Sequence, residues 1–218
     1  MEDTVIFKDS EGTRLSGALT EVTKKNLVIM IHGYGGTKQD EIFNRLIEEL
    51  VPQGISTFRF DMFGHGESDG DFNHMTVRQL VDGLFSALDM LTQMGFENIG
   101  CVGFSLGGLV SLVGASQNDT LSYLSLLSPA SDITSLKSIN DGKDNIAYDI
   151  VKNLHIPVLI VHGTEDKLVS IEQSKKLDSL LSNSILEVVE GADHLYYDEE
   201  LFERAIHLMV DFILKHKQ

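Results

Sequence analysis

Strand-like and helix-like segments alternate along nearly the whole chain, and this alternation restricts the fold more than any other feature of the sequence. Apolar runs of strand length occupy residues 26–33, 55–61, 98–104, 123–129, 157–163 and 186–191. Segments with helical periodicity lie at about 38–52, 76–94, 106–117, 171–181 and 198–215. Such an alternation builds a mainly parallel sheet with helices on both faces. We therefore predict an α/β fold with about eight strands, of which VIFKD and LSGALT open the chain as an antiparallel hairpin.

The 218 residues are expected to form a single domain, 1–218. This length suits one large α/β domain, and no linker rich in Pro, Ser or Gly divides it. The stretch 130–152 is polar and rich in Asp and Lys, and it interrupts the alternation of strands and helices. We interpret it as a short insertion in the domain.

The charge balance excludes several classes of partner. The chain has 33 Asp plus Glu against 17 Lys plus Arg, which gives a formal charge of −16. Nucleic acids and anionic membranes attract basic surfaces, so neither is an expected partner. No apolar run approaches the length of a membrane span, and the start MEDTVIFKDS lacks the basic flank and apolar core of a secretory signal. We expect a cytoplasmic protein, in which the single cysteine, Cys101, is a buried apolar residue rather than part of a disulfide.

Two serines stand at the centre of a G-x-S-x-G match, Ser105 in GFSLG and Ser68 in GESDG. The match has little specificity alone, so the neighbouring elements decide between them. Ser105 lies directly between an expected strand and an expected helix, which is the arrangement of a nucleophile elbow. Several turn-forming residues separate Ser68 from the next helix, and the carboxylates of Glu67 and Asp69 would oppose a developing oxyanion there. We predict that Ser105 is the nucleophile and that GESDG is a structural loop.

A serine nucleophile needs a histidine base. In a sheet that carries a nucleophile elbow, the expected chain order is serine, acid, histidine. His194 lies in a loop after the strand 186–191, at a carboxyl end where open α/β sheets place their chemistry. His207 and His216 instead fall within the last helix and its end. We predict that His194 is the base.

The base needs a carboxylate that orients it. Asp166 follows the strand 157–163 directly, in HGTEDKLVS, and Glu165 beside it is the alternative acid. Asp193 shares the loop of the predicted base and is expected to be structural. His32 and His162 precede the acid in the chain, and we assign them to loop packing. We predict that Asp166 completes a triad.

The loop HGYGGTK after the first buried strand fits an oxyanion loop. Its glycines allow the backbone to approach a substrate closely. The predicted donors to the oxyanion are the backbone N–H groups of Tyr34 and Leu106. A phosphate cradle is a poorer interpretation, because the loop has neither G-x-x-x-x-G-K-[ST] nor G-x-G-x-x-G spacing.

The chain resembles the α/β-hydrolases through HGYGG, DMFGHGESDG, GFSLGG, HGTEDKLVS and EGADH, which occur in the family's order and spacing. It is most similar to bacterial carboxylesterases of the cinnamoyl and feruloyl ester hydrolase type. The resemblance implies an α/β-hydrolase fold and a triad of Ser105, Asp166 and His194, with the insertion at 130–152 as a cap. This cap is about half as long as that of feruloyl esterases, and Tyr148 is its only aromatic residue. The short cap predicts an open acyl site for small or varied esters.

We therefore expect a serine carboxylesterase that needs no metal or cofactor and acts on a small ester through an acyl-enzyme. The same triad would serve a feruloyl or cinnamoyl esterase, a thioesterase, a monoacylglycerol lipase or a peptidase-like enzyme. A non-catalytic binding protein on the same scaffold is a more remote alternative. A dehalogenase or epoxide hydrolase would need a carboxylate at the position of Ser105. The sequence leaves the natural substrate and the oligomeric state open, with a homodimer among the alternatives.

Overall fold

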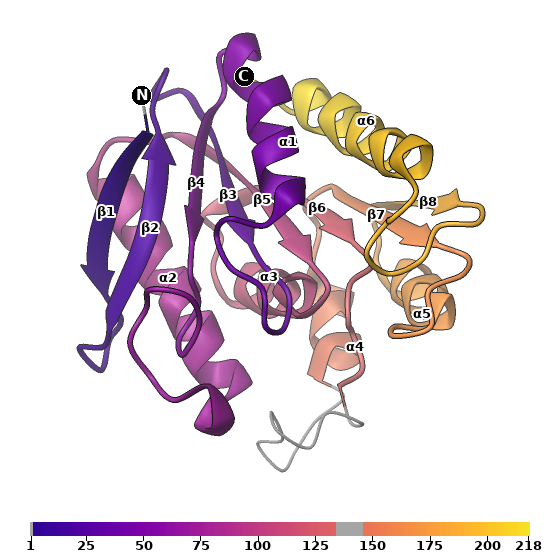
Figure 1. Ribbon diagram of the computed structural model, residues 1–218, viewed down its shortest axis with the longest axis horizontal. Helices are drawn as coiled ribbons and strands as arrows, with labels where there is room; N and C mark the ends of the chain where they lie inside the picture. Colours follow the sequence, from indigo (N-terminus) through magenta and orange to yellow (C-terminus); the bar gives the residue numbers. More distant parts are fainter. Residues whose placement is uncertain (1, 134–145) are drawn as a thin grey trace.

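The computed structural model describes residues 2–133 and 146–218, and its centre is a sheet of eight strands (Figure 1). The strand order is β1-β2-β4-β3-β5-β6-β7-β8. β1 pairs with β2, and β2 with β4, in antiparallel fashion, whereas all other neighbours are parallel. The strands are β1 (Glu2–Lys8), β2 (Arg14–Thr20), β3 (Asn26–Ile31), β4 (Ser56–Phe60), β5 (Asn98–Phe104), β6 (Leu121–Leu127), β7 (Val158–Gly163) and β8 (Ser184–Val189).

Helices cover both faces of this sheet, as Figure 1 shows. α1 and α6 pack together on one face, and α2, α3, α4 and α5 lie on the other. The α-helices are α1 (Glu41–Leu50), α2 (Val77–Gln93), α3 (Leu106–Gln117), α4 (Ile146–Ile150), α5 (Ile171–Leu180) and α6 (Glu199–Lys215). Short 3₁₀ helices span Val51–Gln53, Phe72–His74 and Val151–Asn153.

The central strands are apolar throughout because both of their faces are buried. In β3, Leu27, Ile29 and Ile31 contribute to the core beneath α2 and α3. Val28 and Met30, which alternate with them, contribute to the core beneath α1 and α6. Side chains of a strand point alternately to opposite faces, so a strand between two helical layers needs an unbroken apolar run.

The expected α/β fold is confirmed, including the amino-terminal hairpin and the parallel sheet. The expected strand 98–104 and helix 106–117 have the observed bounds, and other elements differ by a few residues at their ends. Within the expected insertion 130–152, α4 and a 3₁₀ turn were not anticipated, and residues 134–145 lie outside the described residues. No described helix is long and apolar enough to cross a bilayer.

Candidate active site

Ser105 lies at the sharp turn between β5 and α3. Its φ of 52° and ψ of −116° place a non-glycine residue in a sparsely populated backbone region, which costs on the order of 1–3 kcal/mol. A Cβ atom at Gly107 would overlap the carbonyl oxygen of Ile31, and one at Gly103 would overlap Ser111 Oγ and the Gly107 carbonyl. The two glycines of GFSLG therefore permit the close approach of α3 to the sheet that this turn needs.

His194 and Asp166 reach Ser105 from the carboxyl ends of two other strands. His194 lies in the loop after β8, and its Nε2 atom is 3.0 Å from Ser105 Oγ. Its Nδ1 atom is 2.6 Å from Oδ2 of Asp166, which follows β7. The structure thus brings the three predicted residues into one chain of hydrogen bonds. With Nδ1–H donated to the carboxylate, Nε2 of a neutral imidazole is free to accept the serine proton.

The Asp166 carboxylate is fully buried and accepts hydrogen bonds on both oxygens. Oδ1 accepts the backbone N–H groups of Leu168 and Val169 at 2.9 and 2.8 Å. Oδ2 lies near His194 and also 3.2 Å from Nε2 of His162. Burial opposes the charge of Asp166, but the donors from His162, His194 and the backbone outweigh it and hold the pKa of this carboxyl well below its usual range.

His162 is a partner of the site that the sequence reasoning assigned to loop packing. Its buried ring is held between Ser174 Oγ, 2.7 Å from Nδ1, and the Val169 carbonyl, 3.0 Å from Nε2. A carbonyl only accepts, so Nε2 carries a proton that it shares between Val169 and Asp166. The signal available in the sequence was its position, four residues before Asp166 at the end of the same strand.

The glycine-rich loop after β3 lies against Ser105. A Cβ atom at Gly33 would come 3.2 Å from Ser105 Cβ, so a side chain there would crowd the nucleophile. The next residue, Tyr34, packs its ring on Phe72 at 4.9 Å between centroids. On the other side of Ser105, Leu106 is the first residue of α3, where the backbone N–H groups of a helix lack intrahelical partners. The loop that contains Tyr34 and the helix start at Leu106 therefore both adjoin Ser105.

A cavity of about 770 Å³ borders the same loops. Its lining includes Tyr34 of the glycine-rich loop, Phe104 next to Ser105 and Leu195 next to His194. Tyr196, Tyr197 and Phe202 add further aromatic side chains to the wall. A cavity of this size can hold a small organic substrate, and its lining includes the chain neighbours of Ser105 and His194.

The charged side chains of this cavity are mainly acidic. Asp40, Glu41, Glu199 and Glu203 line it together with one cation, Arg45. Arg45 binds Glu203 through two hydrogen bonds of 2.7 and 2.9 Å, and it also contacts Glu49 outside the lining at 2.7 Å. The positive charge of Arg45 is therefore already compensated, and carboxylates outnumber cations in the lining.

The residues set aside in the sequence occupy other positions. The Ser68 hydroxyl donates to the Asp61 carbonyl at 2.6 Å and accepts the Ser16 N–H at 2.9 Å, so it stabilises its loop. Glu165 is exposed, and Asp193 accepts the backbone N–H groups of residues 195 and 197. Cys101 is fully buried, and burial raises the pKa of its thiol to about 12.

Tyr148, the aromatic residue of the short insertion, is itself buried. Its hydroxyl accepts a hydrogen bond of 3.1 Å from Ser131, and the ammonium of Lys176 lies 3.7 Å from its ring centroid. The Tyr148 side chain therefore packs inside the protein, with partners of its own. Across the described parts of the chain, no group of three or more His, Cys, Asp or Glu side chains has the geometry of a metal site.

The parallel sheet with its two helical layers, and a serine at a strand-to-helix elbow, define an α/β hydrolase. The chain belongs to the family described as serine aminopeptidase, S33, whose model matches residues 23–148.

Several solved structures and curated proteins are similar to this chain. Est1E from Butyrivibrio proteoclasticus, solved with ferulic acid bound, is 26% identical with a TM-score of 0.87, and the match covers 97% of this chain and 99% of that one. The esterase Pf2001 of Pyrococcus furiosus, 20% identical, shares the fold with a TM-score of 0.85 over 100% of this chain and 92% of its own. The uncharacterized protein RP471 of Rickettsia prowazekii is 25% identical over 93% of this chain and 86% of its own length. The chain spans only 44 to 51% of several other curated relatives.

Proposed function

We propose that this hydrolase is a serine carboxylesterase that cleaves small or varied carboxylic esters through an acyl-enzyme. The observation that carries the proposal is the hydrogen bond of 3.0 Å between Ser105 Oγ and His194 Nε2, on a ring whose other nitrogen is fixed by Asp166. This geometry activates a serine hydroxyl for attack on a carbonyl carbon.

In the acylation half, Ser105 Oγ attacks the ester carbonyl while His194 Nε2 takes its proton. The carbonyl oxygen becomes an oxyanion that accepts the backbone N–H groups of Tyr34 and Leu106. The tetrahedral intermediate collapses, the bond to the alkoxy oxygen breaks, and His194 returns the proton to the leaving alcohol. Each oxyanion donor contributes about 3 kcal/mol to this transition state.

In the deacylation half, a water molecule replaces the alcohol. His194 takes one proton of the water, and the hydroxide oxygen attacks the acyl carbon. The second intermediate releases Ser105, which regains its proton from His194, and the carboxylic acid leaves. Asp166 stays ionised throughout and stabilises the imidazolium, a role that its low pKa supports.

The cavity beside the site supports neutral or positively charged esters as substrates. Its acidic lining and compensated Arg45 would repel anions, which include coenzyme A thioesters. The same repulsion would favour departure of the carboxylate product. A thioesterase that acts on coenzyme A substrates is therefore a weaker proposal than an esterase.

A feruloyl esterase is the second candidate, because Est1E is similar over almost the full length of both chains and was solved with ferulic acid. The aromatic cavity wall is compatible with a phenolic ring. One observation weighs against this candidate. Tyr148, the aromatic residue of the short insertion, is buried and already contacts Ser131 through its hydroxyl and Lys176 through its ring, so it is not available to a phenolic substrate.

Hydrolysis of a substrate panel tests the proposal. The panel holds nitrophenyl esters of increasing acyl length, methyl ferulate and an acyl-coenzyme A, each measured with the native protein and with Ser105→Ala. We expect short nitrophenyl esters to be cleaved best and Ser105→Ala to lose nearly all turnover. Full activity of Ser105→Ala would disprove the nucleophile, a preference for long acyl chains would disprove the small-ester proposal, and no hydrolysis of any ester would favour a binding protein.

A further inference from the structure

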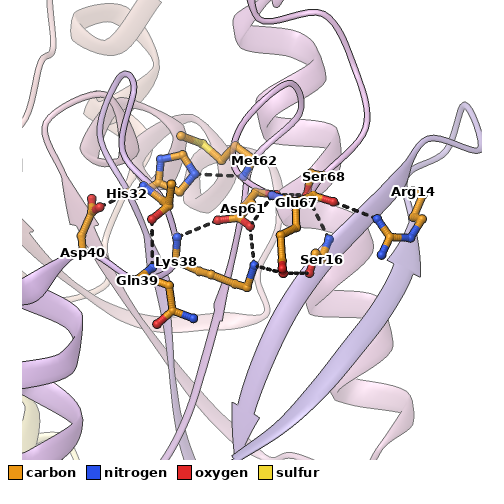
Figure 2. A network of polar contacts seen from close by, with 11 residues as sticks. Arg14, Ser16, His32, Lys38, Gln39, Asp40, Asp61, Met62, Glu67 and Ser68 are labelled. Atoms are coloured by element: carbon orange, nitrogen blue, oxygen red, sulfur yellow. Dashed lines mark hydrogen bonds and ion pairs between the residues drawn. The ribbon is translucent and has the colours of Figure 1, made fainter.

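The loop that follows β4, residues 61–68, includes Ser68 at the centre of the second G-x-S-x-G match and contacts the glycine-rich loop 33–38 at several points (Figure 2). We propose that Lys38, Asp61 and Glu67 form an ion triad that positions the oxyanion loop, so that Lys38 is a positioning residue for catalysis. The inference rests on the proposed oxyanion role of Tyr34. It assigns a function to a lysine and a loop that the mechanism itself does not use.

The triad joins the two loops through main-chain and side-chain contacts. Lys38 Nζ contacts Asp61 Oδ2 and lies 2.8 Å from Glu67 Oε2. The backbone N–H of Lys38 donates to Asp61 Oδ1 at 2.7 Å, and that of Glu67 donates to Asp61 Oδ2 at 2.9 Å. Asp61 therefore fixes the backbone at the end of the oxyanion loop and the backbone of its own loop with one carboxylate.

Two of the three charged side chains of the triad are buried. Lys38 is 5% exposed and Asp61 is 1% exposed, whereas the side chain of Glu67 is 71% exposed. Burial works against the charge of Lys38, but the hydrogen bonds with Asp61 and Glu67 outweigh it and raise the pKa of its ammonium. A buried ion pair adds little net stability over an apolar pair of the same shape, so its advantage here is that it fixes one backbone arrangement.

Two histidines hold the segment on either side of Tyr34. His32 Nδ1 lies 2.8 Å from the Gly33 carbonyl, and its Nε2 accepts the Met62 N–H at 3.0 Å. His65, within the loop 61–68, accepts the Gly35 N–H on Nε2 at 3.3 Å. The peptide groups that flank Tyr34 are thus tied to residues in or next to the loop 61–68. Displacement of this loop would move the predicted oxyanion donor.

The loop 61–68 is itself anchored to the antiparallel edge of the sheet. The Ser16 N–H donates to Ser68 Oγ, and Ser68 Oγ donates to the Asp61 carbonyl. Ser16 Oγ donates to Glu67 Oε2 at 3.1 Å, and Arg14 donates to the Glu67 carbonyl at 2.8 Å. Figure 2 shows this path from β2 to the carboxylates that face Lys38. The contacts with β2 hold the loop 61–68 in place, and the triad in turn holds the oxyanion loop against it.

Lys38→Met tests the proposal, with Arg59→Met as the matched control. Arg59 lies on β4, two residues before Asp61, and it is also a buried cation, 4% exposed. It pairs with Glu2 of β1 at 2.8 Å. Both variants lose a buried cation that is paired with a carboxylate, but only Lys38 lies in the oxyanion loop. The measurements are kcat and KM for nitrophenyl acetate, and the Ki of a trifluoromethyl ketone, whose adduct with Ser105 places an oxyanion in the site.

We expect Lys38→Met to lower kcat by about tenfold or more, short of the 10²–10³ that loss of a whole oxyanion donor costs, with little change in KM. The trifluoromethyl ketone should lose affinity by a similar factor, and Lys38→Arg should recover part of both. Arg59→Met should leave both values near those of the native protein. Equal kcat and Ki in the two methionine variants would overturn the proposal.

If Lys38→Met does not fold, Glu67→Gln replaces it, with Glu2→Gln as its control, since each removes the exposed partner of a buried cation. A drop in kcat and inhibitor affinity for Glu67→Gln alone supports the triad, and no difference between the two variants overturns it. If the native protein cleaves no ester, the proposed function fails separately. Amide hydrogen exchange at residues 33–36 then decides, because the triad requires faster exchange in Lys38→Met than in Arg59→Met.

Discussion

The Nε2 atom of His162 lies 3.2 Å from Oδ2 of Asp166, the oxygen that also lies 2.6 Å from Nδ1 of His194. One carboxylate oxygen thus receives donors from two histidines, of which only the second reaches Ser105. His162 can influence the site only through Asp166, by stabilising its charge and its orientation. The role of such a residue is positioning.

Replacement of this histidine should affect both turnover and stability. In His162→Phe the Asp166 carboxylate loses one donor and the buried Ser174 hydroxyl loses its partner, so we expect the free energy of unfolding to fall by about 1–3 kcal/mol. We expect kcat/KM for a nitrophenyl ester to fall severalfold, because Asp166 is held less firmly. Urea denaturation and steady-state kinetics measure the two effects. Ser174→Ala, which leaves the contact with Asp166 in place, should retain more of the activity, and equal losses of activity would contradict the role.

The strain at Ser105 leads to a second prediction. Glycine adopts a positive φ without the cost that serine carries at 52°, whereas alanine does not. Ser105→Gly and Ser105→Ala should both lose hydrolysis, because both lack the nucleophile. Glycine has more conformational freedom in the unfolded chain, which offsets part of the strain that it relieves. The measured free energy of unfolding should still be about 1 kcal/mol higher for Ser105→Gly than for Ser105→Ala. Thermal or urea denaturation of the two variants is the measurement. A Ser105→Gly variant less stable than Ser105→Ala by about 0.4–1 kcal/mol, the entropic cost of glycine alone, would mean that the elbow stores no backbone strain.

The fold could be predicted from the sequence because its signal is repeated in every strand. In β5 and α3 the change from an apolar run to helical periodicity occurs at Ser105 itself, so even the bounds were correct. The proximity of Ser105, Asp166 and His194 could be predicted for a related reason, since each follows a strand and parallel strands end at one edge of a sheet.

Contacts between loops that leave the sheet gave no comparable signal. Lys38 and Glu67 are 29 residues apart, and nothing in HGYGGTK or GHGESDG indicates that they meet. The chain order of serine, acid and histidine assigns His162 to packing, because this residue precedes the acid. The path of each loop after it leaves its strand determines such contacts, and this path depends on tertiary packing rather than on local pattern.

The two buried histidines that contact the oxyanion loop, His32 and His65, predict a loss of stability in acid. Burial lowers the pKa of His32 to about 4, while the unfolded chain titrates near 6.5. Between these values the unfolded state binds more protons, so the free energy of unfolding falls as the pH falls. The shift corresponds to at most about 3 kcal/mol for His32. Urea denaturation from pH 7 to pH 4.5 should give a shallower pH dependence for His32→Phe than for the native protein. His155→Gln, at an exposed ring beside the neutral Ser182 hydroxyl, should leave this dependence unchanged. A slope unaffected by His32→Phe would show that this ring does not control the acid response.

The acidic lining of the cavity predicts a preference for a positively charged ester over a neutral ester of the same shape. Butyrylcholine and 3,3-dimethylbutyl butyrate differ only in the charge of the quaternary centre. Attraction to the carboxylates and to the aromatic rings of the wall should give the choline ester a severalfold higher kcat/KM. The ratio should fall as salt is added, because exposed charges are screened.

A charge-neutralising variant separates this local effect from the overall charge of −16. Glu41 and Glu199 are exposed members of the cavity lining, and Glu41→Gln/Glu199→Gln should bring the two esters closer to equal rates. Glu97→Gln/Glu187→Gln removes the same amount of charge from residues outside that lining and should leave the ratio nearly unchanged. If both double variants reduce the ratio equally, the net charge of the protein and not the cavity selects the cation. If the native protein has equal kcat/KM values for the two esters, the charge of the substrate does not determine selection, and the size of the cavity is left as its basis.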